Sequence, residues 1–438
     1  MGTLLKTNGQ FRLYLVYQIF SGLGGGIFSL FMLLSVHLIY GNAMYTGIAG
    51  FLMSAPFIFS FAVGPVVDRS NKVRIMRLTT LLEFGLLALL TFTPLLENLG
   101  VMFMFAIIFI YALAALFEGP SGTALLPHIV KEDEILQANS LISIASLTGG
   151  ILLAVLLFGV LAEGENIQLI YGLSTGFLAG AFMFALFLRD PSTKAMPADK
   201  PKHRYLPDLI AGTKFLRKNV LLFFLIAIVT RVFFAEISYI NMPAFVEYHA
   251  GAQGYIVVAV VGMAGSIIAS SLVGTLGKKF KVGQMIFAFY IFAGVARIFF
   301  ALVLPESFNA SLGIVVVFAT FINAAGIVYR TLEQKIPPKD MVGRIDTMTT
   351  TFISISVALG ALVGGFIGRM VPDIAHIFIA QGAIIILTGI YIILVPAIRR
   401  LPKMNDITRE GEGSDQESGS AAFSPTGSSE TAEQFPSI

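Results

Sequence analysis

The sequence has no cysteine and no tryptophan, and only 13% of its 438 residues are charged. The absence of cysteine excludes disulfide bonds, thiolate catalysis and cysteine-ligated metal sites. The scarcity of charge is equally informative, because an average soluble domain has about 25% charged residues and needs polar groups to cover its surface. Soluble enzymes, nucleic-acid-binding proteins and disulfide-stabilised secreted proteins are therefore excluded.

Apolar residues make up 56% of the chain, with 39 phenylalanines, and there are also 43 glycines. The apolar residues form twelve stretches. Each stretch can cross about 30 Å of hydrocarbon as a helix. The stretches cover residues 13–39, 45–67, 76–96, 99–120, 139–162, 167–188, 220–246, 252–276, 284–304, 309–330, 346–369 and 374–396. The sequence thus predicts an all-α polytopic membrane protein, and its first stretch is too long for a signal peptide.

The basic residues follow the alternation of the predicted helices. Of the 29 lysines and arginines, 26 fall in segments that would share one side of the membrane with both termini. Of the other three, Arg369 lies in an opposite loop, and Arg231 and Arg297 lie within predicted helices. Because basic loops stay in the cytoplasm, we expect both termini to be cytoplasmic and the chain to lie in the cell (plasma) membrane.

A polar segment, residues 189–219, divides the predicted helices into six plus six. Residues 126–139 after the fourth helix match residues 333–346 after the tenth, at an offset of about 207 residues. Such a repeat is the layout of secondary transporters, in which two bundles enclose a central site. We expect six-helix pseudo-symmetric bundles over 1–188 and 220–400, a cytoplasmic loop over 189–219, and a disordered, acidic cytoplasmic tail over 401–438.

The connection between the second and third predicted helices carries Gly64, Asp68, Arg69 and Lys72 in the pattern Gly-x-x-x-Asp-Arg-x-x-Lys. The glycine would permit close helix contact. Asp68 would be held near a helix end of the other half, and the two bases would supply cytoplasmic pairing, so the motif would act in gating. The alternative is a short polar turn that obeys the positive-inside rule. The pattern resembles the signature loop of the major facilitator superfamily.

Further segments are similar to the macrolide-efflux and enterobactin-exporter branch (drug:proton antiporters) of that superfamily. They are residues 118–127, 137–140, 212–216 and 333–344, followed by the glycines at 360, 364 and 365. The resemblance covers residues 10–400. It implies the major facilitator fold and a proton-driven antiporter, of the kind found in multidrug resistance. Such a protein exports amphipathic small molecules (drug, macrolide-like or siderophore-like) by alternating access and needs no cofactor.

Ionisable residues inside the predicted helices are functional candidates, because a charge in hydrocarbon is expensive unless it is paired or wetted. Arg231 and Glu236 lie deep in the predicted helix 220–246. They are about 140° apart around it and cannot form an i,i+4 pair. We expect Glu236 to couple proton movement or to contact substrate. We expect Arg231 to bind an anionic substrate group. In each case the alternative is a charge satisfied by its surroundings.

Glu83 and Glu118 are further candidates for proton coupling. For Glu83, however, the simpler expectation is a structural pair with Arg77 near the cytoplasmic interface. For Glu118, the simpler expectation is that it lies at a solvated end of the fourth helix. Arg297 is expected to have a structural partner, and His37 to lie at the outer interface.

In addition to Arg231, seven polar and aromatic residues are predicted to line the substrate cavity: Tyr17, Gln18, Tyr111, Tyr239, Asn241, Asn323 and Tyr329. The sequence shows no metal-ligand spacing, nucleotide-binding loop or catalytic constellation. We therefore expect a monomeric transporter rather than an enzyme, without catalytic residues, metal or nucleic acid. Its partners would be a small-molecule substrate, protons and membrane lipids. The alternatives are an uptake or dedicated metabolite transporter of the same fold, or a non-transporting membrane receptor or scaffold.

Overall fold

The computed structural model describes residues 2–92, 100–131, 167–191, 214–216, 219–338 and 341–407. It also describes residues 134–135, 137–139, 141–142, 145 and 149. These ranges are helical, apart from their turns, and contain no strand. The predicted span 139–162, most of the loop 189–219 and most of the tail 401–438 lie outside the described residues.

The first half of the chain contains a broken membrane span. Its second apolar stretch is interrupted by a short 3-10 helix that has Pro56 near its start, where the missing backbone N–H of proline is tolerated. The elements of this half are α1 (Gly2–Thr7), α2 (Gly9–Tyr40), α3 (Ala43–Ser54), η1 (Ala55–Phe59), α4 (Ser60–Asp68), α5 (Lys72–Phe92), α6 (Gly100–Ile129) and α8 (Ile167–Phe187).

The second half begins with a helix too long to cross a membrane once. The 56 residues of α10 (Leu221–Leu276) would measure about 84 Å if straight. Gly251 interrupts this helix with φ 70° and ψ 174°, a conformation that costs glycine little. Its two parts match the predicted spans 220–246 and 252–276. The remaining elements are α11 (Val282–Val303), α12 (Phe308–Lys335), α13 (Val342–Met370), α14 (Ala375–Leu394), α15 (Pro396–Arg399) and η5 (Met404–Asp406).

The helix bounds confirm the fold class. Nine helices among the described residues are long and apolar enough to cross a membrane, and α10 with its two spans is one of them. The bounds also repeat. The starts of α6 and α12 differ by 308 − 100 = 208 residues, and the ends of α8 and α14 differ by 394 − 187 = 207. This offset is the one that the sequence repeat predicts.

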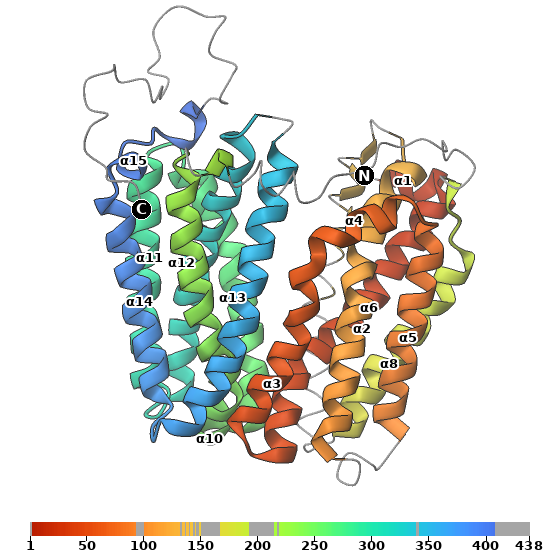
Figure 1. Cartoon of the computed structure of the whole chain (residues 1–438), viewed down its shortest axis with the longest axis horizontal. Helices are drawn as coiled ribbons and strands as arrows, with labels where there is room; N and C mark the ends of the chain where they lie inside the picture. The colour runs from red at the N-terminus through yellow and green to blue at the C-terminus, as the bar shows by residue number, and fades with distance from the viewer. Residues whose placement is uncertain are drawn as a thin grey trace, which may run out of the picture.

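Figure 1 shows two bundles side by side, one containing α2, α5, α6 and α8 and the other containing α10 to α14. We call the end of the molecule that carries α1 and α15 the terminal end, and the opposite end the distal end (Figure 1). The turns at the distal end depend on glycine. Gly41, the C-cap of α2, has φ 59°, and Gly251 reverses α10.

Small residues bring helices into close contact within each bundle. In the first bundle, the Ser174 hydroxyl of α8 donates to the Gly24 carbonyl of α2 (2.7 Å). In the second, a Cβ on Gly294 of α11 would lie 2.6 Å from the carbonyl oxygen of Gly382 of α14. Apolar side chains cannot drive helix association against equally apolar lipid, so this close packing is the main attraction between the helices.

The two halves meet at the distal end through glycines of α3 and α13. A Cβ on Gly365 of α13 would lie 2.8 Å from the Cα of Gly47 of α3. One turn further along α3, Gly50 packs against Ile240 of α10, and a Cβ there would lie 3.3 Å from that of Ala361. The two helices therefore touch backbone to backbone, and Figure 1 shows α3 lying against the second bundle at this end.

We expect Gly365→Ala to weaken this contact, because the new methyl group would overlap the α3 backbone. An overpacked contact costs about 1–3 kcal/mol, so the apparent Tm in detergent should fall by several degrees. Gly313→Ala is the matched control, because Gly313 of α12 has open space around it. Equal Tm values for the two variants would contradict the contact.

Candidate functional site

A polar cluster lies inside the first bundle, where α2, α5 and α6 meet. The half-buried Glu118 of α6 accepts two hydrogen bonds at Oε1. One comes from the hydroxyl of Tyr17 (2.5 Å) and the other from the hydroxyl of Ser21, both on α2. The Tyr17 hydroxyl also forms a hydrogen bond with Thr80 Oγ1 of α5 (2.9 Å). One hydrogen-bonded cluster thus joins side chains of three helices.

Glu83 of α5 completes this cluster and is only 1% exposed. Its carboxyl group lies close enough to that of Glu118 to interact with it, while its own Oε1 is buried and has no hydrogen-bond partner among the described residues. We call Glu83 and Glu118 the carboxylate pair. Tyr14 and Tyr111 lie close enough to interact electrostatically with it.

Two expectations about this pair were wrong. Glu83 does not pair with Arg77, because the Arg77 guanidinium donates to backbone carbonyls at the C-terminal end of α8. These are the carbonyls of Ala185 (2.9 Å), Leu186 (3.0 Å) and, one residue past the helix, Leu188 (2.7 Å). Helix-terminal carbonyls lack partners within their own helix and accept such donors readily. Glu118 does not end its helix either, because α6 continues through Pro120 to Ile129.

The two ionisable residues of α10 have different surroundings. Arg231 reaches Tyr290 of α11, with which it forms a side-chain hydrogen bond, while its Nε is buried and has no hydrogen-bond partner within the described ranges. Glu236 is partly exposed. It packs against Gly360 of α13 and has no hydrogen bond or ion pair within the described part of the chain. Their roles remain predictions.

The other predicted cavity residues do not form one site. Tyr239, with 43% of its surface exposed, and Asn323 both lie on the surface of their helices rather than in a shared pocket. Gln18 lies beside Gly122 of α6. Tyr17 belongs to the cluster on Glu118, and Tyr111 is buried with its ring centroid 4.2 Å from that of Phe28.

Two further predicted cavity residues join helices of the second bundle. Asn241 of α10 donates from Nδ2 to the carbonyl of Gly364 of α13 (2.9 Å), and it lies where any side chain on Gly368 would overlap it. The buried Tyr329 of α12 donates to Glu333 (3.5 Å) and forms a hydrogen bond with Thr349 of α13 (3.4 Å). Both side chains are buried rather than free to meet a ligand.

Arg297 has the structural partner that was expected. The guanidinium donates from Nε to Gln381 Oε1 of α14 (2.5 Å). Its Cζ also lies 4.7–5.3 Å from the ring centroids of Phe300, Phe318 and Phe378. Cation–π contacts of this kind are strongest when desolvated, and Arg297 is only 5% exposed.

An ion pair joins the two halves at the distal end. His37 Nε2 of α2 lies 3.8 Å from Glu247 Oε2 of α10, with the side chains 18% and 36% exposed. When His37 is protonated, this pair reinforces the contact between α3 and α13. We call His37 and Glu247 the distal pair.

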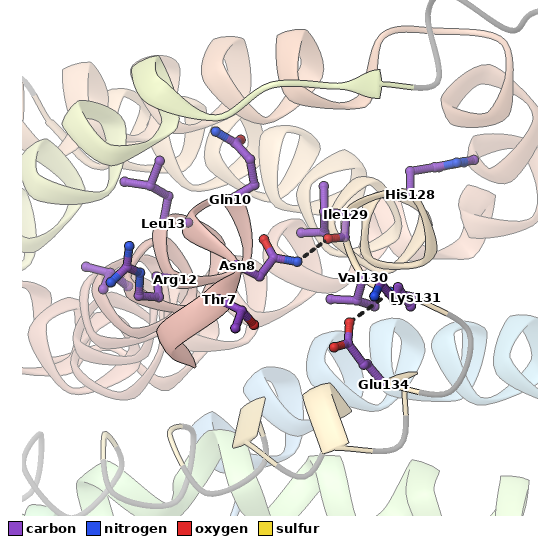
Figure 2. Close-up of a pocket in the computed structure, with 12 residues that line it drawn as sticks. Thr7, Asn8, Gln10, Arg12, Leu13, His128, Ile129, Val130, Lys131 and Glu134 are labelled. Carbon is purple, nitrogen blue, oxygen red and sulfur yellow. Dashed lines mark hydrogen bonds between the residues drawn. The ribbon is translucent and has the colours of Figure 1, made fainter. Parts of the chain in front are cut away.

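A cavity of about 1010 Å³ opens at the terminal end of the first bundle. Figure 2 shows Asn8 donating from Nδ2 to the carbonyl of Ile129 (2.6 Å) at the end of α6, with Lys131 and Glu134 joined beyond it. Arg12 and His128 also line this cavity. The residues predicted to line the substrate cavity do not contribute to it.

The signature motif lies at the terminal end, between α4 and α5. Asp68 is the last residue of α4 and Lys72 the first of α5. The backbone N–H of Lys72 donates to Asp190 Oδ2 (2.8 Å), which ties the motif to the segment after α8. Arg69 is exposed. The side chain of Asp68 lies outside the described structure.

Comparison with known families agrees with this architecture. A family model described as Major Facilitator Superfamily matches residues 14–361. The chain belongs to the major facilitator superfamily. It is therefore a membrane-spanning transporter of small molecules and not an enzyme, as the sequence predicts.

This major facilitator protein has curated relatives with names that refer to export. It is 23% identical over 376 residues to "Macrolide efflux protein A" of Streptococcus pyogenes, covering 82% of this chain and 89% of that protein. It is also 23% identical over 411 residues to "Enterobactin exporter EntS" of Citrobacter koseri, covering 91% of this chain and 94% of the relative.

Solved transporters share the fold at low identity. The nucleoside transporter NupG superimposes with a TM-score of 0.69 at 12% identity, covering 88% of this chain and 98% of that one. A bacterial homologue of the iron transporter ferroportin in an inward-facing state also gives 0.69 at 12% identity, with coverage of 89% and 98%. These likenesses establish the fold.

Sequence reasoning missed two features of this major facilitator protein. Thr80 gave no signal, because a threonine in an apolar helix more often bonds its own backbone. The distal pair joins residues 210 positions apart (247 − 37). Nothing in the local pattern of either residue indicates that contact, although the expected place of His37 at the outer interface was a usable hint.

We expect Glu247→Gln to loosen the distal end. In acidic buffer, where His37 is protonated, a partly exposed ion pair of this kind contributes about 0.5–1 kcal/mol. Its loss should then make the open fraction roughly two- to fivefold larger. The reporter is Ala361→Cys, which places the single thiol of the chain in the buried contact between α3 and α13. Its labelling by an impermeant maleimide should accelerate by that factor.

The matched control is Glu306→Gln, which removes an exposed carboxylate between α11 and α12. This variant should leave the labelling rate of Ala361→Cys unchanged. Equal rates in Glu247→Gln and Glu306→Gln would show that the distal pair does not hold the halves together.

Proposed function

We propose that this protein exports amphipathic small molecules from the cytoplasm by alternating access, and that inward movement of protons drives the cycle. The terminal end faces the cytoplasm of a cell membrane in this proposal, because 26 of the 29 basic residues lie in segments assigned to that side. The export names of the curated relatives support the direction.

The observation that carries the proposal is closure at the distal end. Backbone contact between Gly47 and Gly365 holds the halves together there. His37 and Glu247 reinforce this contact when His37 is protonated. With the distal end outside the cell, this arrangement blocks the outer exit and leaves substrate to enter from the cytoplasm. The bacterial homologue of ferroportin in an inward-facing state superimposes on this fold with a TM-score of 0.69.

The first part of α10 is the substrate-binding surface in this proposal. Glu236 is partly exposed and has no partner within the described residues, so its carboxylate is available to a cationic group. Tyr239, three residues on and 43% exposed, offers a ring for apolar or cation–π contact. An amphipathic amine, such as an amino-sugar macrolide, would pair its ammonium group with the Glu236 carboxylate and place its apolar part against the Tyr239 ring.

The motif residues act in gating. Gly64, Asp68, Arg69 and Lys72 lie around the connection from α4 to α5 at the terminal end, where the halves must approach when the outer exit opens. Charge pairing by Asp68 with the other half would stabilise that outward-open state, so the motif sets how fast the protein cycles.

The experiment uses everted membrane vesicles, whose lumen corresponds to the cell exterior. Vesicles with the protein should accumulate radiolabelled erythromycin when the lumen is acidified, and a protonophore should release it. Vesicles without the protein give the background. Accumulation that is absent, or that survives the protonophore, would contradict proton-driven export.

We expect Glu236→Gln to bind erythromycin about tenfold more weakly, because a charge-assisted hydrogen bond contributes about 1.5 kcal/mol or more. The measurement is equilibrium binding to the purified protein. Glu306→Gln removes a carboxylate outside this surface and should bind as the wild type does. Unaltered binding in Glu236→Gln would exclude the residue from the substrate surface.

A further inference from the structure

We propose that the carboxylate pair, Glu83 and Glu118, is the site that carries the transported proton, and that it lies in the half opposite the substrate surface of α10. This inference rests on the proposed function and assigns its coupling step to residues. Glu236 then contacts substrate and carries no proton across.

The carboxylate pair lies deep in the membrane. Glu83 is 83 − 72 = 11 residues from the start of α5, and Glu118 is 129 − 118 = 11 residues from the end of α6. Both helix ends are at the terminal end, so at a rise of about 1.5 Å per residue each side chain is about 16 Å inside. This depth places the carboxylate pair near the middle of the hydrocarbon, where a proton site must be reached from either side in turn.

No base neutralises the carboxylate pair within the described part of the chain. The titratable groups around it are Tyr14 and Tyr17 from α2 and Tyr111 from α6, which carry no charge in their ordinary form. No ion pair to Glu83 or Glu118 occurs among the described residues. Arg77 lies on the same helix as Glu83, but its guanidinium donates to backbone carbonyls at the C-terminal end of α8. Two adjacent carboxylates without a cation repel each other strongly in a dry site. One bound proton removes half of that charge.

The two carboxyl groups differ in a way that fits binding and release. Glu118 Oε1 accepts hydrogen bonds from the hydroxyls of Tyr17 and Ser21, so this oxygen is occupied as an acceptor. Glu83 has a buried Oε1 that no hydrogen-bond partner reaches in the described part of the chain, which suits the protonated, neutral form. The proton therefore resides on Glu83, and the half-buried Glu118 is the group through which it enters and leaves.

The proton balance of the cycle is simple. Protonation converts the Glu83 carboxylate to the acid with one O–H bond formed, and release to water breaks that bond and restores the anion. Release leaves two neighbouring charges, which only hydration relieves. Loss of the proton is therefore favoured when water reaches Glu118 from the cytoplasm, and protonation favours closure around the pair.

The test is Glu83→Gln, which keeps the shape of the side chain and removes the titratable group. In everted vesicles this variant should lose accumulation of erythromycin driven by an acid lumen. It should retain exchange of labelled for unlabelled erythromycin at equal pH, because α10 is untouched. Glu333→Gln is the matched control, since Glu333 is also buried but lies in the second bundle with Tyr329 as its partner. It should keep both activities.

The outcomes separate the two proposals. If wild-type vesicles show no gradient-driven accumulation, the proposed function fails. If wild type accumulates erythromycin and Glu83→Gln does so equally, the function stands and the carboxylate pair is not the proton site. A requirement for sodium in place of the pH gradient also overturns it. If Glu83→Gln does not fold, Glu118→Gln takes its place with the same expected loss.

Discussion

An ionised side chain inside a bilayer must find a partner, because the hydrocarbon offers no water. Within the described residues, this constraint sorts the buried charges of the protein into two classes. Arg77 uses free carbonyls at the end of α8, and Arg297 uses Gln381 with three phenylalanine rings. These cations are structural. Among the same residues the carboxylate pair has no compensating charge, and Glu236 has no hydrogen bond or ion pair. These are the groups to which we assign protons and substrate.

The arrangement of the two classes suggests how transport and coupling are divided between the halves. The carboxylate pair is held by α2, α5 and α6 of the first bundle, whereas the partly exposed side chains of α10 belong to the second. Glycine contacts between α3 and α13, with the distal pair beside them, hold the halves at the distal end. Packed interfaces of this kind have discrete arrangements rather than a continuous range. A proton bound in one half and a substrate bound in the other can therefore bias the same conformational equilibrium.

The sequence predicts the fold well because membrane insertion imposes a simple length rule on apolar stretches. The bounds of α8 and α14 fall within two residues of the predicted spans, and α6 and α12 begin within one residue of theirs although they end later. The long helix α10 bends at Gly251, where two spans were expected. Partners of side chains were harder to predict. Tyr111 and Asn241 are on the expected helices, yet both are buried against neighbouring helices, because the rotation of each helix about its axis is set by tertiary packing. Arg77 was close to Glu83 along α5, but its long side chain reaches α8 instead.

The central claim is that a proton is bound between Glu83 and Glu118 in the resting protein. Infrared difference spectroscopy tests it without any substrate, through the carbonyl stretching band of a protonated carboxylic acid. At neutral pH the purified wild-type protein should show this band, sodium should not alter it, and Glu83→Gln should lack it while Glu333→Gln keeps it. A spectrum that is the same in wild type and Glu83→Gln would contradict the account.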